Sequence, residues 1–458
     1  MDGSGSISEA PKVFPRMGRT IVENCYLFQV ADQHILYSPL DKLLLSLDDK
    51  AVASLQQNQT RDAWKQVIDP DGEYGLFGGN QPSVDDYITE GAYDGLVLLM
   101  NNLCNMGCTY CYAKDAQNQE NQTFQEQLWI DTVGYAFSNL KKGIGEFTVG
   151  FHGYGECTVE FHKIKKITEL IEEKTRECGI TPLFSITTNG TFSAADCEWM
   201  VDRGFRFNIS LDGNKAVNDA TRPAAGGRSF HDKVTHNIQM ISEAPRCKMH
   251  IRATVTRGNV HLMAESLRYF HSLGAKSVQF EPITPRGAAV DMGPLGACDI
   301  ADFTENFKEC IVLASELGIA LRYGPLNFGL AVRFCSSQSK LTVDYKGRIL
   351  SCLQAAPDSG LDFFQFGTIS KESGVKISDQ KLEDINRFSV YDNVSCDTCL
   401  LKYHCAGDCK AQDIDLAKHP SFKKGKCAHN EELFSWCLNE LLSGDRANSI
   451  LDFELEEI

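Results

Sequence analysis

The spacing of hydrophobic positions switches repeatedly between two periods over the central part of the chain, from Leu96 to about Ile283. Short apolar runs with a period of two indicate strands, and longer segments with apolar residues three or four positions apart indicate helices. In the segment His162–Cys178, for example, Ile164, Ile167 and Ile171 fall on one helical face. The expected strands are Leu96–Met100, Phe147–Phe151, Phe184–Thr187, Phe205–Leu211, Met249–Val255 and Ser277–Phe280, and the expected helices include His162–Cys178, Ser193–Arg203, Asp232–Ser242 and Leu262–Leu273.

This alternation predicts an α/β fold. Strands that are joined by helices form a parallel sheet, because a crossover connection returns the chain to the same end of the sheet. The helices would pack on the outside of the sheet. The loops at the carboxyl ends of the strands then meet at one edge, and we expect the chemistry of the protein there.

The pattern before this region is different. Residues 21–85 contain two short alternating runs, Cys25–Val30 and His34–Tyr37, and then a helix-like stretch at Asp48–Gln57. A hairpin followed by a helix predicts a small α+β or winged module. Residues 1–20 are rich in Gly and Ser and are expected to be a disordered tail.

Composition narrows the classes of function. The chain of 458 residues has 61 acidic and 45 basic residues and a net charge of −16, which argues against a nucleic-acid binder. No apolar run reaches the roughly 20 residues that span a bilayer, so no membrane attachment is expected. The first residues lack the apolar segment of a secretory signal. We therefore expect a cytoplasmic enzyme whose 18 cysteines serve metal chemistry in place of disulfides.

Three of these cysteines, Cys104, Cys108 and Cys111, follow the first expected strand of the sheet directly. Three thiolates can hold three irons of a [4Fe–4S] cluster and leave the fourth iron without a protein ligand. Zinc sites usually close with four protein ligands, often as two Cys-x-x-Cys pairs. The spacing therefore indicates a reactive cluster, with buried structural thiols or half of a zinc site as the alternatives.

With Tyr110 before the last cysteine, this run resembles the CxxxCxΦC signature of the radical S-adenosylmethionine enzymes. The resemblance implies a (β/α)6 partial TIM barrel. It also implies that S-adenosylmethionine chelates the open iron and that one electron cleaves it to a 5′-deoxyadenosyl radical, which takes hydrogen from a substrate. Cys104, Cys108 and Cys111 would then be both metal ligands and catalytic residues.

The loop after the second strand carries a second motif of this family. The run Gly153-Tyr154-Gly155-Glu156 stands where the family has a GGEP sequence, with Tyr154 in place of a glycine and Cys157 in place of the proline. The resemblance implies that Gly153, Gly155 and Glu156 receive the amino group of S-adenosylmethionine. The alternative is a flexible glycine-rich turn.

Further residues are assigned to the cofactor by the same resemblance. Ser210 and Asp212 lie in an SLDG sequence after the fourth strand, and Arg222 follows it. Arg252, on an otherwise apolar strand, would bind the carboxylate of S-adenosylmethionine, although a strand-end arginine can also form a surface ion pair. Tyr110 would pack near the adenine, or serve as a core aromatic residue.

A second set of cysteines lies near the C-terminus and matches the SPASM extension, which holds two auxiliary [4Fe–4S] clusters. The alternative is a pair of zinc ribbons. No cysteine lies a few residues before Cys335, so the inner cluster would have an open iron or would be closed by Cys298 or Cys310. Carried over by motif, the outer cluster takes Cys396, Cys399, Cys405 and Cys427, and the inner cluster takes Cys335, Cys352 and Cys409.

Taken together, the resemblance implies three [4Fe–4S] clusters, S-adenosylmethionine, and a maturase that forms a thioether or carbon–carbon link in a ribosomally made peptide. Its partners would be a precursor peptide with leader and core, and an electron donor such as a flavodoxin or ferredoxin. The N-terminal module would bind the leader by strand addition, as RiPP recognition elements do. One alternative is an anaerobic sulfatase-maturating enzyme, but its catalytic Asp is replaced by Leu353 here. A non-catalytic electron carrier or scaffold is the other.

The expected organisation has six parts. They are a tail at 1–20, the N-terminal module at 21–85, the radical domain at 86–300, a bridging region at 301–334, the SPASM domain at 335–440 and a tail at 441–458.

Overall fold

The structure is a computed structural model that describes residues 19–85, 91–284, 286–292, 296–335, 339–417 and 420–443. The tail predicted at residues 1–20, except for its last two residues, lies outside these ranges, and so does most of the tail predicted at 441–458. Among the described residues, none of the helices has the length and apolar character that a membrane crossing requires.

A large sheet forms the frame of the molecule, and in the described residues it has 11 strands in the order β11-β10-β9-β8-β7-β6-β5-β12-β13-β14-β15. The strands from β11 to β12 all run parallel to their neighbours. The six strands expected from the sequence are the centre of this parallel part. They are β5 (Gly95–Leu99), β6 (Glu146–His152), β7 (Thr181–Thr188), β8 (Arg206–Ser210), β9 (Lys248–Val255) and β10 (Ser277–Pro282).

The sheet continues beyond the expected strands on both edges. β11 (Ala320–Arg322) pairs with β10, and β12 (Lys340–Asp344) pairs with β5. The region expected to bridge two domains thus supplies a helix and an edge strand, and β11 is too short to show a period in the sequence. Antiparallel strands extend the β12 edge: β13 (Arg348–Leu350), β14 (Gln365–Ser370) and β15 (Gly374–Ile377).

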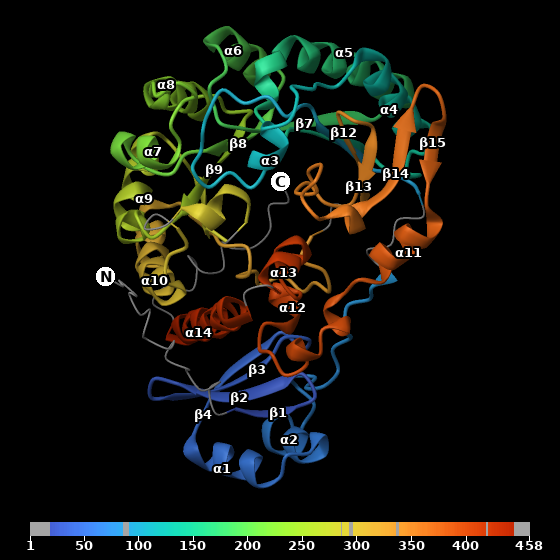
Figure 1. The fold of residues 1–458 in the computed structure, drawn as a ribbon. Helices are drawn as coiled ribbons and strands as arrows, with labels where there is room; N and C mark the ends of the chain where they lie inside the picture. Colours follow the sequence, from blue (N-terminus) through green and yellow to red (C-terminus); the bar gives the residue numbers. More distant parts are fainter. Residues whose placement is uncertain are drawn as a thin grey trace, which may run out of the picture.

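Helices between the parallel strands, apart from the short α3, which Figure 1 shows further inside, lie in an arc outside the sheet (Figure 1). The longest of these begin and end at ordinary capping residues: Asp299 accepts a hydrogen bond at the start of α10, and Gly179 and Gly318 end α5 and α10 with φ of 69° and 64°. The helices are α3 (Lys114–Gln117), α4 (Glu126–Ser138), α5 (Phe161–Cys178), α6 (Ala194–Asp202), α7 (Lys215–Thr221), α8 (His231–Ser242), α9 (Met263–Ser272) and α10 (Ile300–Leu317).

The N-terminal residues form a separate antiparallel sheet, β1 (Thr20–Val22), β2 (Cys25–Val30), β3 (Gln33–Ser38) and β4 (Leu43–Leu47), followed by α1 (Asp49–Gln57) and α2 (Arg61–Ile68). Leu27, Leu36, Leu55 and Trp64 pack in its own core. The sequence predicts a hairpin and one helix, whereas the structure has four strands and two helices. The outer strands are short or continuously apolar, so neither shows a period of two.

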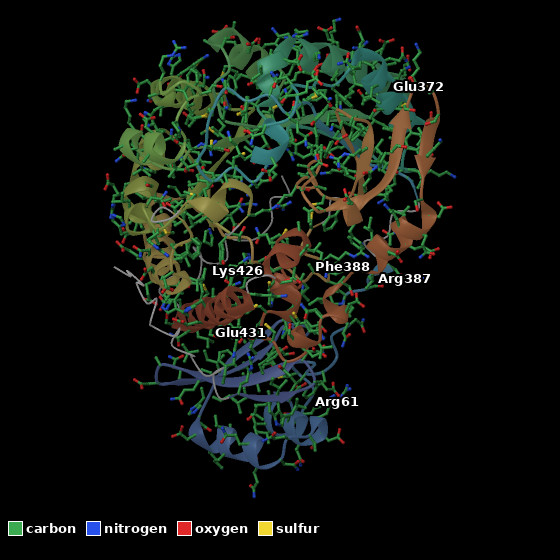
Figure 2. The ribbon with its side chains drawn as sticks, in the orientation of Figure 1. Arg61, Glu372, Arg387, Phe388, Lys426 and Glu431 are labelled. Carbon is green, nitrogen blue, oxygen red and sulfur yellow. The ribbon has the colours of Figure 1, made fainter. Side chains whose placement is uncertain are left out.

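The remaining helices lie between this module and the large sheet (Figure 1). Tyr26 donates a hydrogen bond from its hydroxyl to the carbonyl of Cys399 (2.9 Å), and the hydroxyl of Tyr37 lies 2.6 Å from Nε2 of His404. Figure 2 shows Glu431 on α14, where it pairs with Arg19 at 3.0 Å. These helices are α11 (Asp379–Arg387), α12 (Lys402–Cys405), α13 (Lys410–Leu416) and α14 (Pro420–Ser443).

The structure therefore has the mixed α/β fold with a large parallel sheet that the hydrophobic pattern predicts. Closure of the sheet as a partial TIM barrel, the winged character of the N-terminal module and the predicted domain limits stay predictions.

Candidate active site at the carboxyl ends of the strands

A cavity of about 360 Å³ lies where the carboxyl ends of the parallel strands meet. Its walls come from the loop after β5, the loop after β6 and the last residues of β7 to β10. Most of the residues that the sequence assigns to the cofactor are in this wall. The predicted site residues that line it are Cys104, Cys108, Tyr110, Cys111, Gly153, Gly155, Glu156, Ser210, Arg222 and Arg252.

The loop with the three cysteines is held by backbone pairing with the segment after α7. The amide of Gly107 donates to the carbonyl of Pro223 (2.8 Å), and the amide of Thr109 donates to the carbonyl of Thr221 (2.9 Å). Met106 and Ala224 form an antiparallel bridge between the two segments. The segment Thr221-Arg222-Pro223 thus supports the cysteine loop and also brings Arg222 to the cavity.

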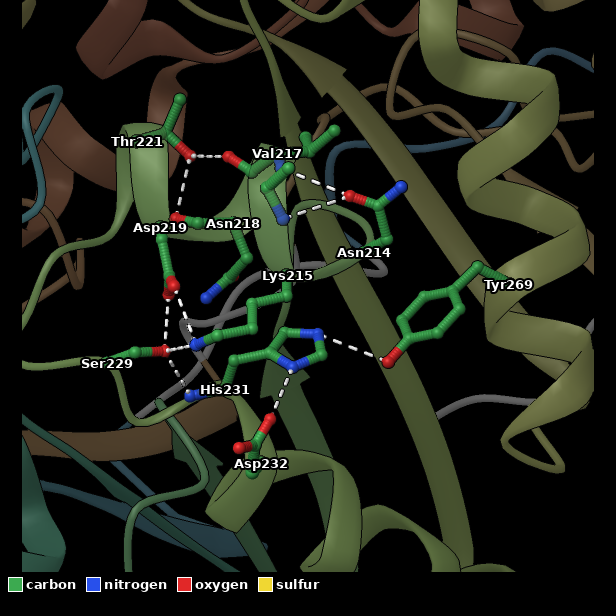
Figure 3. Close-up of polar contacts among 11 residues, drawn as sticks. Asn214, Lys215, Val217, Asn218, Asp219, Thr221, Ser229, His231, Asp232 and Tyr269 are labelled. Atoms are coloured by element: carbon green, nitrogen blue, oxygen red, sulfur yellow. Dashed lines mark hydrogen bonds and ion pairs between the residues drawn. The ribbon is translucent and has the colours of Figure 1, made fainter.

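A polar network on the outer side of α7 fixes this supporting segment (Figure 3). Lys215 pairs with Asp219 at 2.9 Å, and the hydroxyl of Ser229 donates to Asp219 at 2.7 Å. The hydroxyl of Tyr269, on α9, lies 3.1 Å from Nε2 of His231, and the two rings stack. The network ties both ends of the stretch between α7 and α8, so the segment that pairs with the cysteine loop is anchored on each side.

The chemistry of the three thiols fits an iron–sulfur cluster. Burial raises the pKa of Cys104 to about 12 and that of Cys111 to about 11, and the neighbouring thiols add to both shifts. A thiol binds iron as the thiolate, so positive metal charge at this wall would offset the cost of ionising the buried group. In the described part of the chain, no three His, Cys, Asp or Glu side chains stand as a group that could share one metal ion.

The glycine-rich loop after β6 packs tightly on Leu103, which directly precedes Cys104 in the segment after β5. A Cβ atom on Gly155 would lie 1.8 Å from the carbonyl oxygen of Leu103, so only glycine fits there. The amide of Glu156 donates to this same carbonyl (2.6 Å). Tyr154, at the position where the family has a glycine, has a structural role here: its hydroxyl donates a hydrogen bond to the carbonyl of Ala355 at 2.9 Å.

The carboxylate of Glu156 already has donors within the protein. Thr188 donates to Oε1 (2.7 Å), the amide of Asn189 donates to Oε2 (2.6 Å), and the amide of Thr158 donates to Oε1 (3.1 Å). Glu156 therefore joins the ends of β6 and β7 while it lines the cavity. Its contact with the amino group of S-adenosylmethionine stays a prediction.

Asp212 is the one predicted cofactor residue that does not line the cavity. Its carboxylate accepts hydrogen bonds from the hydroxyls of Tyr110 (2.7 Å) and Thr221 (2.6 Å) and from the amide of Thr254 (3.0 Å). Tyr110 in turn accepts a hydrogen bond from Arg222 (2.6 Å). Asp212 thus positions Tyr110 from behind, and its side chain is buried in this network.

Arg252 differs from Arg222 in having no fixed partner. Its side chain is exposed and lines the cavity, and it makes no hydrogen bond or ion pair within the described residues. A guanidinium in such a position is available to a carboxylate ligand.

Charges among the C-terminal cysteines act on one another in two sets, and the assignment of these sets to two clusters stays a prediction. Burial raises the pKa of Cys352 to about 12, and the charges of Cys409 and Cys335 add to this shift. Burial also raises the pKa of Cys427 to about 11, and Asp408 and Cys396 add to it. The pKa of Cys405 is likewise raised by burial, and the charges of Cys399 and Cys427 add to the shift. The first set lies beside the cavity, because Leu353 and Gln354 line it directly after Cys352.

Whether Cys298 or Cys310 supplies a fourth ligand to the inner cluster stays a prediction. The pKa of Cys298 is raised by burial and by Asp302 and Asp299, and that of Cys310 by burial and by Glu309. Both thiols are buried near or within α10. The open inner iron stays a prediction.

Sequence reasoning missed several residues of the cavity wall, including Tyr154, Glu281 and Arg286 as contributors. Arg286 donates to Oε1 of Gln354 (2.7 Å) and to its carbonyl (3.1 Å), which joins the loop after β10 to the loop after Cys352. For Glu281 there was a usable signal. It is a charged residue on an apolar strand, as Arg252 is.

The chain is similar to several known proteins. No family model matches the chain. A serine-type anaerobic sulfatase-maturating enzyme from Klebsiella aerogenes is 24% identical over 323 residues, which are 67% of this chain and 77% of that protein. An uncharacterized protein from Methanocaldococcus jannaschii is 26% identical over 192 residues, 42% of this chain, and the match spans 63% of that protein, less than two thirds of its length.

A solved structure described as native anSMEcpe with bound AdoMet and Cp18Cys peptide is similar with a TM-score of 0.61 and 18% identity, covering 77% of this chain and 99% of that one. At this identity the match shows a shared fold. Together with the curated relatives, it confirms the resemblance to radical S-adenosylmethionine enzymes with a SPASM extension, and the prediction that the chain is an enzyme.

Proposed function

We propose that this protein is a peptide-modifying radical S-adenosylmethionine enzyme. One observation carries the proposal: the three cysteines, the glycine-rich loop and Arg252 come from separate strands and line one cavity. When bound, the cluster and S-adenosylmethionine supply a 5′-deoxyadenosyl radical. Cys104, Cys108 and Cys111 would hold the cluster, Arg252 the carboxylate of S-adenosylmethionine, and Tyr110, fixed by Asp212, the wall of the pocket.

The substrate is a peptide, and the product carries a thioether or carbon–carbon link. The solved neighbour holds a bound Cp18Cys peptide, which supports a peptide substrate here. Two auxiliary clusters, on the two C-terminal cysteine groups, would take up the electron that leaves the substrate when the link forms. A flavodoxin or ferredoxin would reduce the first cluster.

The N-terminal sheet offers two outer strands, β1 and β4, to the leader of such a precursor. Tyr26 and Tyr37 connect this sheet to the segment that bears the outer cysteine group. A leader bound there would bring the core of the precursor to the same half of the molecule as the clusters.

Formylglycine formation is the second candidate, because the curated relatives include a sulfatase-maturating enzyme. The residue after Cys352 argues against it. Leu353 lines the cavity at this position and supplies no carboxylate.

The test uses anaerobically reconstituted protein, S-adenosylmethionine, dithionite and the small cysteine-containing peptides encoded beside the gene. We expect 5′-deoxyadenosine and a peptide that has lost two hydrogens and no longer reacts with iodoacetamide at the linked cysteine. A product that instead reacts with a hydrazine as an aldehyde would favour formylglycine formation. Release of no 5′-deoxyadenosine would contradict both.

A further inference from the structure

The inner wall of the cavity contains an acidic residue that the proposed cofactor contacts do not use. Glu281 stands at the end of β10 and lines the cavity. Its Oε1 accepts hydrogen bonds from Nε2 of Gln279 (2.6 Å) and from the amide of Gly324 (2.7 Å). Within the described residues, Oε2 has no hydrogen-bond partner. One carboxylate oxygen is therefore fixed and the other is available to a ligand.

A chain of hydrogen bonds along the sheet sets the direction of this carboxylate. Since a carboxylate can only accept here, Gln279 must present its NH₂ group to Glu281, and its oxygen then accepts from Nε2 of His250 at 3.2 Å. Nδ1 of His250 in turn accepts from the hydroxyl of Ser277 at 2.7 Å. Burial lowers the pKa of His250 to about 4, which agrees with the neutral ring that this arrangement needs.

The charges nearby leave Glu281 in need of a cation. Lys426, buried on α14, acts on it but is held by Asp408 (2.5 Å) and Gln412 (3.1 Å). Arg252, the other cation that acts on Glu281, is assigned to the carboxylate of S-adenosylmethionine by the proposed function. With Arg252 engaged, a partly enclosed carboxylate remains without a counter-charge, which is costly unless a ligand supplies one.

We propose that Glu281 binds a cationic side chain of the peptide substrate, a lysine or arginine near the modified residue, and so selects which residue is presented to the radical. This inference rests on the proposed function and adds a specificity determinant to it. Of the carboxylates in the cavity wall, Glu156 is engaged by Thr158, Thr188 and Asn189, so Glu281 is the one with a free oxygen among the described lining residues.

The test is a selection of random-sequence peptides by mRNA display on the anaerobically reconstituted holoenzyme loaded with S-adenosylmethionine. Wild type is expected to enrich peptides with Lys or Arg at one position. Glu281→Gln should reduce this enrichment by about tenfold or more, the effect of losing a charge-assisted hydrogen bond. Glu281→Lys should favour Asp or Glu at the same position. Glu316→Gln, an exposed residue of α10 outside the cavity wall, is the matched control and should select as wild type does.

In Glu281→Gln, any change in the affinity for S-adenosylmethionine should be smaller than the tenfold loss of cation enrichment, because Arg252 keeps its own charge. Equal cation enrichment by wild type and Glu281→Gln would overturn the proposal, as would selection without any cation preference. A tenfold loss of S-adenosylmethionine affinity would also overturn it, by assigning Glu281 to the cofactor. Failure of wild type to cleave S-adenosylmethionine would contradict the proposed function instead, and the selection, which needs no turnover, would still decide the role of Glu281.

Discussion

The two cysteine-bearing regions of this molecule are organised in different ways. Cys104, Cys108 and Cys111 share one short loop, which follows β5 and is held by backbone hydrogen bonds to the segment after α7. The seven C-terminal cysteines come from loops, short helices and α14 between residues 335 and 427, and Cys335 is exposed. The sheet therefore prepares the first site, whereas the second sites depend more on the ions that their thiols bind.

The largest effect that would sharpen this comparison is expected from Cys405→Ala. Cys405 lies among the outer group of thiols, so its loss should remove one of three clusters, about a third of the bound iron. Cys437→Ala is the matched control, since Cys437 is buried on α14 and belongs to neither group. Iron and sulfide analysis of the reconstituted proteins gives the answer. Full iron content in Cys405→Ala would contradict the predicted ligand set.

A smaller effect should follow from Gly155→Ala, which attacks the preorganised site. The added Cβ would overlap the carbonyl oxygen of Leu103, so the loop must move, at a cost of about 3 kcal/mol. Gly145→Ala is the control, because a Cβ there meets no atom within 4 Å. Denaturant unfolding compares the two variants. Equal stabilities would show that the loop after β6 is not packed as the structure has it.

The sequence predicts the centre of the fold well because each parallel strand is long enough to show its apolar period. Observed β6 and α5, for example, lie within one residue of their predicted ends. The added strand β11 is not apparent in the sequence, because three residues carry little periodic signal. The motifs likewise identify the wall of the cavity but not the direction of each side chain. Asp212 was expected at the cofactor, and the structure shows it behind Tyr110, because three donors from its own neighbourhood take up its oxygens.

The smallest effect concerns how α14 is attached to the rest of the molecule. Hydrogen bonds from His429 and Lys308 lower the pKa of Glu432 to about 2. A lowered carboxyl pKa stabilises the fold above the ordinary pKa of about 4.3, and this contribution fades as the pH falls towards 2. Because the ion pair between Glu432 and Lys308 is partly exposed, Glu432→Gln should lower the free energy of unfolding by about 1 kcal/mol at pH 7 and by less at pH 3.

Urea unfolding of the metal-free protein at both pH values measures this difference. Glu372→Gln, in the exposed turn before β15 that Figure 2 labels, should show no such change. A cost that is the same at pH 7 and pH 3 would mean that the charge of Glu432 does not stabilise the attachment of α14.

The most direct test of the account is the release of 5′-deoxyadenosine by reconstituted wild type, Cys104→Ala and Cys178→Ala, with iron measured in the same samples. Cys178 is exposed at the end of α5 and serves as the control. The account predicts release by wild type and Cys178→Ala and none by Cys104→Ala, which should also lose the iron of the first cluster. Equal release by all three proteins, or zinc in place of iron at the three cysteines, would contradict it.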